Sequence, residues 1–153
     1  MKDNKMRRPV EIRKFRPADM NLIDRIERAS FGKDAYDGNL FAELYHKYGD
    51  LFLVALGRST VCGYMVTSTR GDRAEIISIA VAPRDRKRGT ASALMESTLR
   101  RLRRRKIARV VLMVKVTNEA ARRFYAKYGF DKVRLVRKYY EDDADGVLMA
   151  RKL

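Results

Sequence analysis

Residues 75–99 read EIISIAVAPRDRKRGTASALMESTL, and this stretch decides the fold. Its residues 76–81 form a run of apolar and β-branched side chains, which is typical of a buried strand. Pro83 follows and ends the strand, because proline lacks the N–H group that a sheet needs. Beyond Gly89, apolar residues recur at helical spacing. The stretch therefore predicts a strand, a short turn and a helix in direct succession.

The turn is strongly cationic, because four basic residues lie between Pro83 and Gly89. The N-terminus of a helix presents N–H groups without intrahelical partners and the positive end of the helix dipole, so it favours phosphate. Gly89 and Ala91 leave room for a bulky anion against the backbone. The turn predicts an anion site, although a plain connection with solvated arginines would have the same composition.

The spacing of Arg86, Gly89 and Ala91 resembles the acetyl-CoA loop of the GNAT acetyltransferases, Q/R-x-x-G-x-G/A. The resemblance implies that backbone N–H groups and cationic side chains of this turn hold the pyrophosphate of acetyl-CoA. The residues that it implicates are Arg86, Lys87, Arg88, Gly89, Thr90 and Ala91.

Length and composition indicate one soluble domain. The chain has 153 residues, enough for a single sizeable core, and no apolar run approaches the roughly 20 residues of a membrane span. The basic N-terminus lacks the apolar stretch of a signal peptide, so we expect a cytoplasmic protein with no membrane partner. Cys62 is the only cysteine and His46 the only histidine, so neither an intrachain disulfide nor a metal-binding cluster is expected.

The net charge is +16, which draws a chain toward nucleic acid, ribosomes or anionic cofactors without choosing among them. Six basic residues crowd the end of the helix predicted after Gly89: Arg100, Arg101, Arg103, Arg104, Arg105 and Lys106. Cations suit the C-terminal end of a helix dipole, so a solvated helix face explains them. Binding of ribosomal RNA is the alternative.

The rest of the chain alternates between strand and helix patterns. Strands are expected at residues 10–16, 51–56, 61–69, 75–81, 108–116, 130–138 and 146–153, and helices from Pro17, at 40–48, after Gly89 and from Asn118. A loop is expected at 30–39 and a loose basic tail at 1–8. This order resembles the GNAT fold, an α/β domain, here at 9–153, with a mixed, mostly antiparallel sheet and about four flanking helices.

Motifs in the second half resemble those of the N-terminal acetyltransferases within this family. They are NEAA at 118–121, FY at 124–125, YGF at 128–130, KYY at 138–140 and DGVLM at 145–149. The resemblance covers the chain from Val10 onward and is to the bacterial RimI-like enzymes, the archaeal enzymes and the catalytic subunit of eukaryotic NatA. It implies direct transfer of an acetyl group from acetyl-CoA to the α-amino group of a protein, in a ternary complex.

The resemblance also implies chemical roles. Tyr125 matches the family tyrosine whose hydroxyl faces the CoA sulfur, and a phenol with a pKa of about 10 stays protonated at neutral pH and can donate to a thiolate. Backbone N–H groups of Ile79, Ala80 and Val81 would bond the pantetheine arm, which in this family lies between two parted strands. Asn118 would contact the same arm. Helix capping by Asn118 and core packing by Tyr125 are the alternatives.

The general base is less evident. RimI-like enzymes carry glutamate or histidine where this chain has Met113, and a thioether accepts no proton at neutral pH. Glu75 stands where the archaeal and eukaryotic relatives have histidine or tyrosine, and a carboxylate partly withdrawn from water there would act through a water molecule. Solvent exposure beside the turn at 71–73 is its alternative. Asp34 lies in a segment that resembles the archaeal E-N-Y-P loop near the substrate amine, and it is the second candidate, with solvation as its alternative.

A weak base suffices for an α-amine. Its pKa is about 8 against about 10.4 for lysine, so neutralising it at pH 7 costs about 1.4 rather than about 4.6 kcal/mol. Besides Asp34, the residues Tyr36, Tyr139 and Tyr140 are expected to bind the substrate peptide, although the last two also suit plain strand packing. We therefore predict an enzyme that acetylates protein N-termini. Acetylation of lysine or small amines, and a catalytically weak RNA- or ribosome-binding module, are the alternatives.

Overall fold

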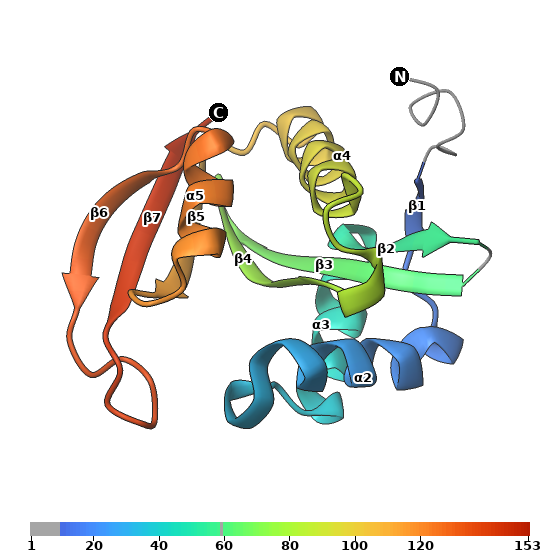
Figure 1. Cartoon of the computed structure of the whole chain (residues 1–153). Coiled ribbons are helices and arrows are strands. Elements are labelled where there is room, and N and C mark those ends of the chain that lie inside the picture. Colours follow the sequence, from blue (N-terminus) through green and yellow to red (C-terminus); the bar gives the residue numbers. More distant parts are fainter. Residues whose placement is uncertain (1–9, 59) are drawn as a thin grey trace, which may run out of the picture.

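The computed structural model describes residues 10–58 and 60–153 (Figure 1). The predicted basic tail at 1–8 lies outside the described residues, and so does Ser59 in the turn between the second and third strands. With η marking a 3-10 helix, the elements are β1 (Glu11–Lys14), η1 (Pro17–Asp19), α2 (Met20–Phe31), η2 (Gly32–Asp34), α3 (Gly38–Tyr48), η3 (Gly49–Leu51), β2 (Phe52–Gly57), β3 (Thr60–Arg70), β4 (Arg73–Val81), η4 (Pro83–Asp85), α4 (Thr90–Arg104), β5 (Arg109–Lys115), α5 (Glu119–Lys127), β6 (Asp131–Val136) and β7 (Gly146–Lys152). The predicted order of strands and α-helices is confirmed.

Seven strands form one sheet in the order β1-β2-β3-β4-β5-β7-β6. Every neighbouring pair is antiparallel except β4 and β5, which run parallel. A parallel pair cannot be closed by a hairpin, and α4 supplies the crossover between these two strands. The prediction of a mixed, mostly antiparallel sheet is confirmed.

The α-helices cover both faces of the sheet, with α4 and α5 on one side and α2 and α3 on the other (Figure 1). Each side has its own apolar core: Leu94 and Leu112 belong to the first, and Ile23, Phe41 and Phe52 to the second. Alternate strand residues point to opposite faces, so the same strands serve both cores. No helix in the described part of the chain is long and apolar enough to cross a membrane.

The segment predicted as a loop at 30–39 is largely ordered into helices. α2 continues through Phe31, and α3 begins at Gly38 after only η2 and three further residues. Asp37 caps α3, because its Oδ1 accepts a hydrogen bond from the Leu40 N–H at 3.0 Å. The glycines at 32 and 38 resemble loop signals, whereas Gly32 ends α2 and Gly38 is the first residue of α3.

β4 and β5 separate soon after they meet. They pair only from Arg73 opposite Arg109 to Glu75 opposite Val111. Ile77 is then an extra residue in β4, a β-bulge between the residues that oppose β3, and a bulge bends its strand. In Figure 1 the two strands diverge from this point. Their separated segments leave backbone groups that the other strand does not pair.

Candidate active site

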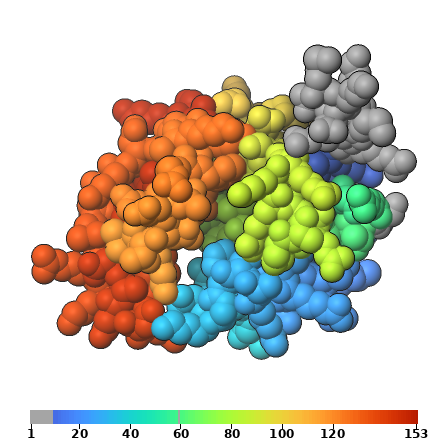
Figure 2. Space-filling view, in the orientation of Figure 1, coloured from blue at the N-terminus to red at the C-terminus, as the bar shows by residue number. Residues whose placement is uncertain are grey.

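A cavity of about 180 Å³ lies where β4 and β5 diverge. Figure 2 shows the region as a hollow between α2 (blue), the turn into α4 (yellow-green) and α5 (orange). The lining residues are Glu27, Phe31, Asp34, Tyr36, Ile76, Ile77, Ser78, Ile79, Leu112, Met113, Val114, Lys115, Asn118, Ala121, Tyr125 and Tyr140. The structure thus brings six predicted site residues to one cavity: Asp34, Tyr36, Ile79, Asn118, Tyr125 and Tyr140.

Tyr125 reaches this cavity from α5. Its side chain is buried, and its ring packs edge-on against Phe124 and Phe130. Burial, with a smaller contribution from Tyr140, raises the pKa of Tyr125 above its ordinary value. The hydroxyl therefore keeps its proton over the whole neutral range and can act as a donor. Tyr125 therefore packs in the core, as the alternative to a catalytic role proposed, and it also lies on the cavity wall.

The turn into α4 leaves the start of that helix open. Gly89 is the residue before the helix, with φ +80°, and no side chain caps the first turn. A Cβ atom at Gly89 would meet nothing within 4 Å, so there is space against the backbone. The N–H groups of a first helical turn have no intrahelical acceptors. The local structure is that of the predicted anion site.

Arg86 holds this turn in place. Its Nε donates to the Val81 carbonyl at 3.0 Å, and its guanidinium also donates to the Ser30 hydroxyl at 3.2 Å. The side chain thus ties the turn to the end of β4 and to α2. Lys87 and Arg88 are exposed, so their charges are available to an anion at the turn.

Asn118 is the N-terminal cap of α5. Its Oδ1 accepts a hydrogen bond from the Ala121 N–H at 3.2 Å, which confirms the capping alternative. The residue also lines the cavity, so capping does not remove it from the site. Ala80 and Val81 are buried in β4 beyond the bulge, outside the cavity lining itself.

Ion pairs cross the mouth of the cavity. Lys115 of β5 lies 2.6 Å from Asp34 and 3.2 Å from Asp142, and Asp142 lies 3.0 Å from Lys33. Lys33, the Ala144 N–H and Lys115 together hold the pKa of Asp142 well below its usual range. These charges connect η2 to β5 and to the turn before β7. Asp34 therefore faces a cation in the structure.

Three tyrosines stand around the mouth. Tyr36 is 42% exposed and Tyr140 is half-buried, and both line the cavity. Tyr139 is 49% exposed and packs edge-on against Tyr140 with 4.9 Å between ring centroids, but it does not line the cavity. Burial and the charges of Tyr139, Glu27 and Glu75 raise the pKa of Tyr36.

Glu75 differs from its prediction. The expectation that it is partly withdrawn from water is wrong, because its side chain is exposed and does not line the cavity. It is the last residue of β4 that pairs with β5, so the cavity begins just beyond it. Met113 of β5, which stands where RimI-like enzymes carry glutamate or histidine, does line the cavity. The base role of Glu75 stays a prediction.

The sequence prediction missed Glu27, which is 1% exposed and lines the cavity from α2. Its carboxylate accepts hydrogen bonds from the hydroxyls of Tyr64 and Ser78 and from the Tyr36 N–H. One signal was available: Glu27 lies on the same helical stripe as Ile23 and Ile26, where a surface helix normally carries apolar residues.

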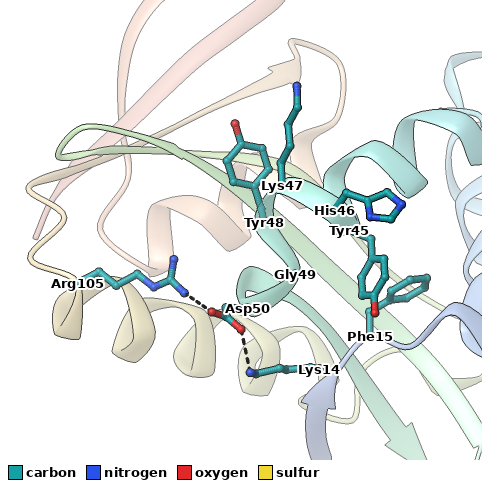
Figure 3. A pocket seen from close by; sticks show the side chains of 9 residues that line it. All are labelled: Lys14, Phe15, Tyr45, His46, Lys47, Tyr48, Gly49, Asp50 and Arg105. Carbon is teal, nitrogen blue, oxygen red and sulfur yellow. Dashed lines mark hydrogen bonds and ion pairs between the residues drawn. The ribbon is translucent and has the colours of Figure 1, made fainter.

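A second hollow, of about 500 Å³, lies between the ends of β1, α3 and α4 (Figure 3). It is lined by Lys14, Phe15, Tyr45, His46, Lys47, Tyr48, Gly49, Asp50 and Arg105. Asp50 pairs with Lys14 at 2.8 Å and with Arg105 at 3.1 Å. Of the predicted basic run, only Arg105 lines it. Across the described residues, no group of three His, Cys, Asp or Glu side chains is placed to hold a metal ion.

Comparison with known proteins identifies the family. Residues 20–130 match the model of the acetyltransferase (GNAT) family. An uncharacterised N-acetyltransferase of Methanocaldococcus jannaschii is 36% identical, over 92% of this chain and 90% of its own. A protein of Saccharolobus solfataricus named N-alpha-acetyltransferase is 30% identical, over 95% of both chains. The crystal structure of Ard1 from Thermoplasma volcanium is 32% identical and superposes with a TM-score of 0.90, over 94% of this chain and 97% of that one. The chain therefore belongs to the GNAT family, and it is an N-acetyltransferase that uses acetyl-CoA.

Proposed function

We propose that this acetyltransferase modifies the α-amino groups of proteins, by direct transfer in a ternary complex. The observation that carries the proposal is the buried Tyr125 on the wall of the cavity between β4 and β5, behind a mouth flanked by Tyr36 and Tyr140. The name of the Saccharolobus solfataricus relative, N-alpha-acetyltransferase, supports it.

The residues present suit acetyl-CoA, which supplies the acetyl group as a thioester. The uncapped first turn of α4 and the open space at Gly89 suit a pyrophosphate, and Arg86, Lys87, Arg88, Thr90 and Ala91 complete that turn. Beyond the bulge, Ile79, Ala80 and Val81 pair with β3 but not with β5, so the edge of β4 that faces β5 suits an amide-containing arm. Asn118 lines the same cavity as Ile79.

Tyr125 is the proposed general acid. Because burial raises its pKa, its hydroxyl carries a proton throughout the neutral range, and it can give that proton or a hydrogen bond to a leaving sulfur. Loss of this donor should affect the chemical step more than peptide binding, since the leaving group acquires charge only during the reaction.

The site lacks a strong base at the position of Met113, and this favours an α-amine as substrate. Neutralising an α-amine at pH 7 costs about 1.4 kcal/mol, against about 4.6 kcal/mol for lysine. Glu75 stays a candidate that would act through water from outside the cavity. Asp34 is a candidate only if its ion pair with Lys115 opens. Asp34, Tyr36, Tyr139 and Tyr140 are the proposed contacts of the peptide.

Association with RNA is a second candidate function, supported by the exposed cations at the end of α4. Arg100, Arg103, Arg104, Arg105 and Lys106 are exposed, and Arg105 also borders the hollow of Figure 3 with Lys14 and Lys47. Clustered cations of this kind attract phosphate backbones. Such contacts would bring the enzyme to nascent chains or ribosomal proteins without altering the chemistry at Tyr125.

Incubation of the protein with acetyl-CoA and a library of peptides with different N-terminal residues tests the proposal. We expect mass spectrometry to find acetyl groups on the α-amines of a subset of the library. Tight acetyl-CoA binding without turnover on any peptide would favour the binding-module alternative. Turnover confined to lysine side chains or to free small amines would favour the same-fold alternatives.

A further inference from the structure

Glu27 is a carboxylate buried in the wall of the cavity. It lies on α2, is 1% exposed, and shares its helix face with Ile23 and Ile26, which are part of the apolar core on that side of the sheet. A charged side chain at such a position is unfavourable unless other groups compensate it. The contacts of Glu27 therefore bear on what the site binds.

All the hydrogen bonds of Glu27 come from neutral donors. Oε1 accepts from the Tyr64 hydroxyl and, at 2.9 Å, from the Ser78 hydroxyl, while Oε2 accepts from the Tyr36 N–H at 2.9 Å. Tyr64 and Ser78 are themselves within 3.1 Å of each other. These bonds connect α2 to β3, to β4 beside the bulge and to the loop that carries Tyr36. They fix the carboxylate but leave its negative charge unpaired.

No cation of the described residues pairs with Glu27: no Lys, Arg or His nitrogen there lies within 4.0 Å of its carboxylate oxygens. The chain carries a net charge of +16, and less buried carboxylates such as Asp19, Asp34 and Asp50 each have a basic partner. A buried charge is normally paired. Glu27 is thus a buried negative charge that only neutral groups contact in the described part of the chain.

One acceptor position of Glu27 is still available. A carboxylate offers about four lone-pair positions, and the described contacts use two on Oε1 and one on Oε2. Glu27 and Ser78 line the same cavity as Met113 and Tyr125. A donor that enters this cavity would therefore meet a fixed carboxylate oxygen in the same cavity as the proposed acid.

We propose that Glu27 is the counter-ion of the substrate's α-ammonium group and takes the proton that this group must lose. The inference rests on the proposed acetylation of α-amines. In the step, an N–H bond of the ammonium breaks, its electron pair stays on nitrogen, and the proton bonds to Oε2 of Glu27, which becomes a neutral carboxylic acid. The proton passes to water after the acetylated product has left. Glu27 then accepts the proton that the thioether of Met113 cannot accept.

Glu27→Gln is the decisive variant because glutamine has nearly the same shape without the charge. Its amide oxygen can accept from the Tyr36 N–H, and its amide nitrogen can donate to Tyr64 and Ser78, whose hydroxyl hydrogens rotate. Glu43→Gln, at an exposed position of α3, is the control for the loss of one negative charge.

The measurement is calorimetric binding of two peptides at pH 7 in the presence of CoA, which cannot react. One is a peptide that the wild-type protein acetylates, and the other is its Nα-acetylated product, which is neutral at the terminus. We expect Glu27→Gln to weaken binding of the free-amine peptide by about tenfold or more, the usual effect of losing a charged hydrogen bond, and to change binding of the product less than about twofold. Glu43→Gln should keep the preference for the free amine.

Equal weakening for both peptides, or no change for either, would overturn the inference about Glu27 while leaving the proposed function intact. A wild-type protein that acetylates no free-amine peptide would overturn the proposed function and this inference with it. If Glu27→Gln does not fold, the wild-type ratio decides: a preference of about tenfold or more for the free-amine peptide over the product supports a buried counter-ion, and equal affinities contradict it.

Discussion

The Asp34 carboxylate lies 2.6 Å from the Lys115 ammonium group, and this pair ties the loop after α2 to β5 across the mouth of the cavity. Lys115 also reaches Asp142, which pairs with Lys33. The four charges are partly exposed and belong to three separate segments of the chain. Their arrangement indicates that Asp34 holds η2 against β5 and so positions the segment that carries Tyr36 at the mouth of the cavity.

Asp34→Asn should therefore raise the peptide KM about two- to fivefold and leave kcat nearly unchanged, because partly exposed ion pairs are worth about 0.2–1 kcal/mol. Steady-state kinetics at pH 7 and pH 9 check this. Asp131→Asn, at an exposed position of β6, is the matched control. A fall in kcat at pH 7 that disappears at pH 9 would instead make Asp34 the general base.

Gly89→Glu should weaken acetyl-CoA binding by about tenfold or more, because it places bulk and negative charge where the pyrophosphate would lie. Gly71→Glu is a close control, because Gly89 and Gly71 both have positive φ, at +80° and +62°. A Cβ atom at either position would meet no other atom within 4 Å. Both variants should lose similar stability from backbone strain. Calorimetry that found equal acetyl-CoA affinities in the two folded variants would place the cofactor site elsewhere.

Tyr125→Phe should lower kcat about 10²-fold or more and leave the peptide KM nearly unchanged, as expected for an interaction made in the transition state. The phenyl ring keeps the packing against Phe124 and Phe130, so the melting temperature should stay close to that of the wild-type protein. Tyr128→Phe, on the turn that ends the same helix, should have no such effect on kcat. Wild-type turnover in Tyr125→Phe would reduce Tyr125 to a packing residue.

Replacement of Arg100, Arg101, Arg103 and Arg104 by glutamine should weaken RNA binding and flatten its dependence on salt concentration, because fewer counterions are then released. Turnover on a short neutral peptide should survive, since Arg100 lies eleven residue steps beyond Gly89 along the helix, about 16 Å at roughly 1.5 Å per residue. Arg105 is kept because it pairs with Asp50. Filter binding at several salt concentrations, beside peptide kinetics, separates the two effects. Loss of short-peptide turnover in a folded variant would place these arginines in the active site.

The order of elements was predictable from sequence because the helices repeat apolar residues at helical spacing, while the strands appear as alternating patterns or short continuous apolar runs between turn residues. The residues at which helices and strands begin and end were harder to predict. Gly32 and Gly38 look alike as loop signals, yet one ends α2 and the other begins α3. Likewise β6 ends at Val136, although the strand was predicted to run to residue 138. Lys138 has a φ of +52°, which is incompatible with extended strand backbone.

The site residues that belong to a local sequence motif were predicted. A residue that joins the site only through contacts between distant segments was missed. Gly89 and Asn118 begin helices, so their neighbours in sequence reveal them. Glu27 is held in the site by hydrogen bonds from Ser78 and Tyr64, which lie in two strands far from it in the sequence. For Glu75, the sequence left burial and solvent exposure as alternatives, because the choice depends on where β5 stops pairing with β4. Only the charged residue within an apolar helix stripe could have drawn attention to Glu27.

One pair of peptides distinguishes the α-amine from the lysine side chain as the group that this enzyme acetylates. Both peptides have the same lysine-containing sequence of an accepted substrate, one with a free α-amine and one with the α-amine blocked. Acetyl transfer from acetyl-CoA is followed by tandem mass spectrometry, which locates the acetyl group. We predict acetylation of the first peptide at its α-amine and none of the second; acetylation of both peptides at the lysine side chain, at equal rates, would contradict the account.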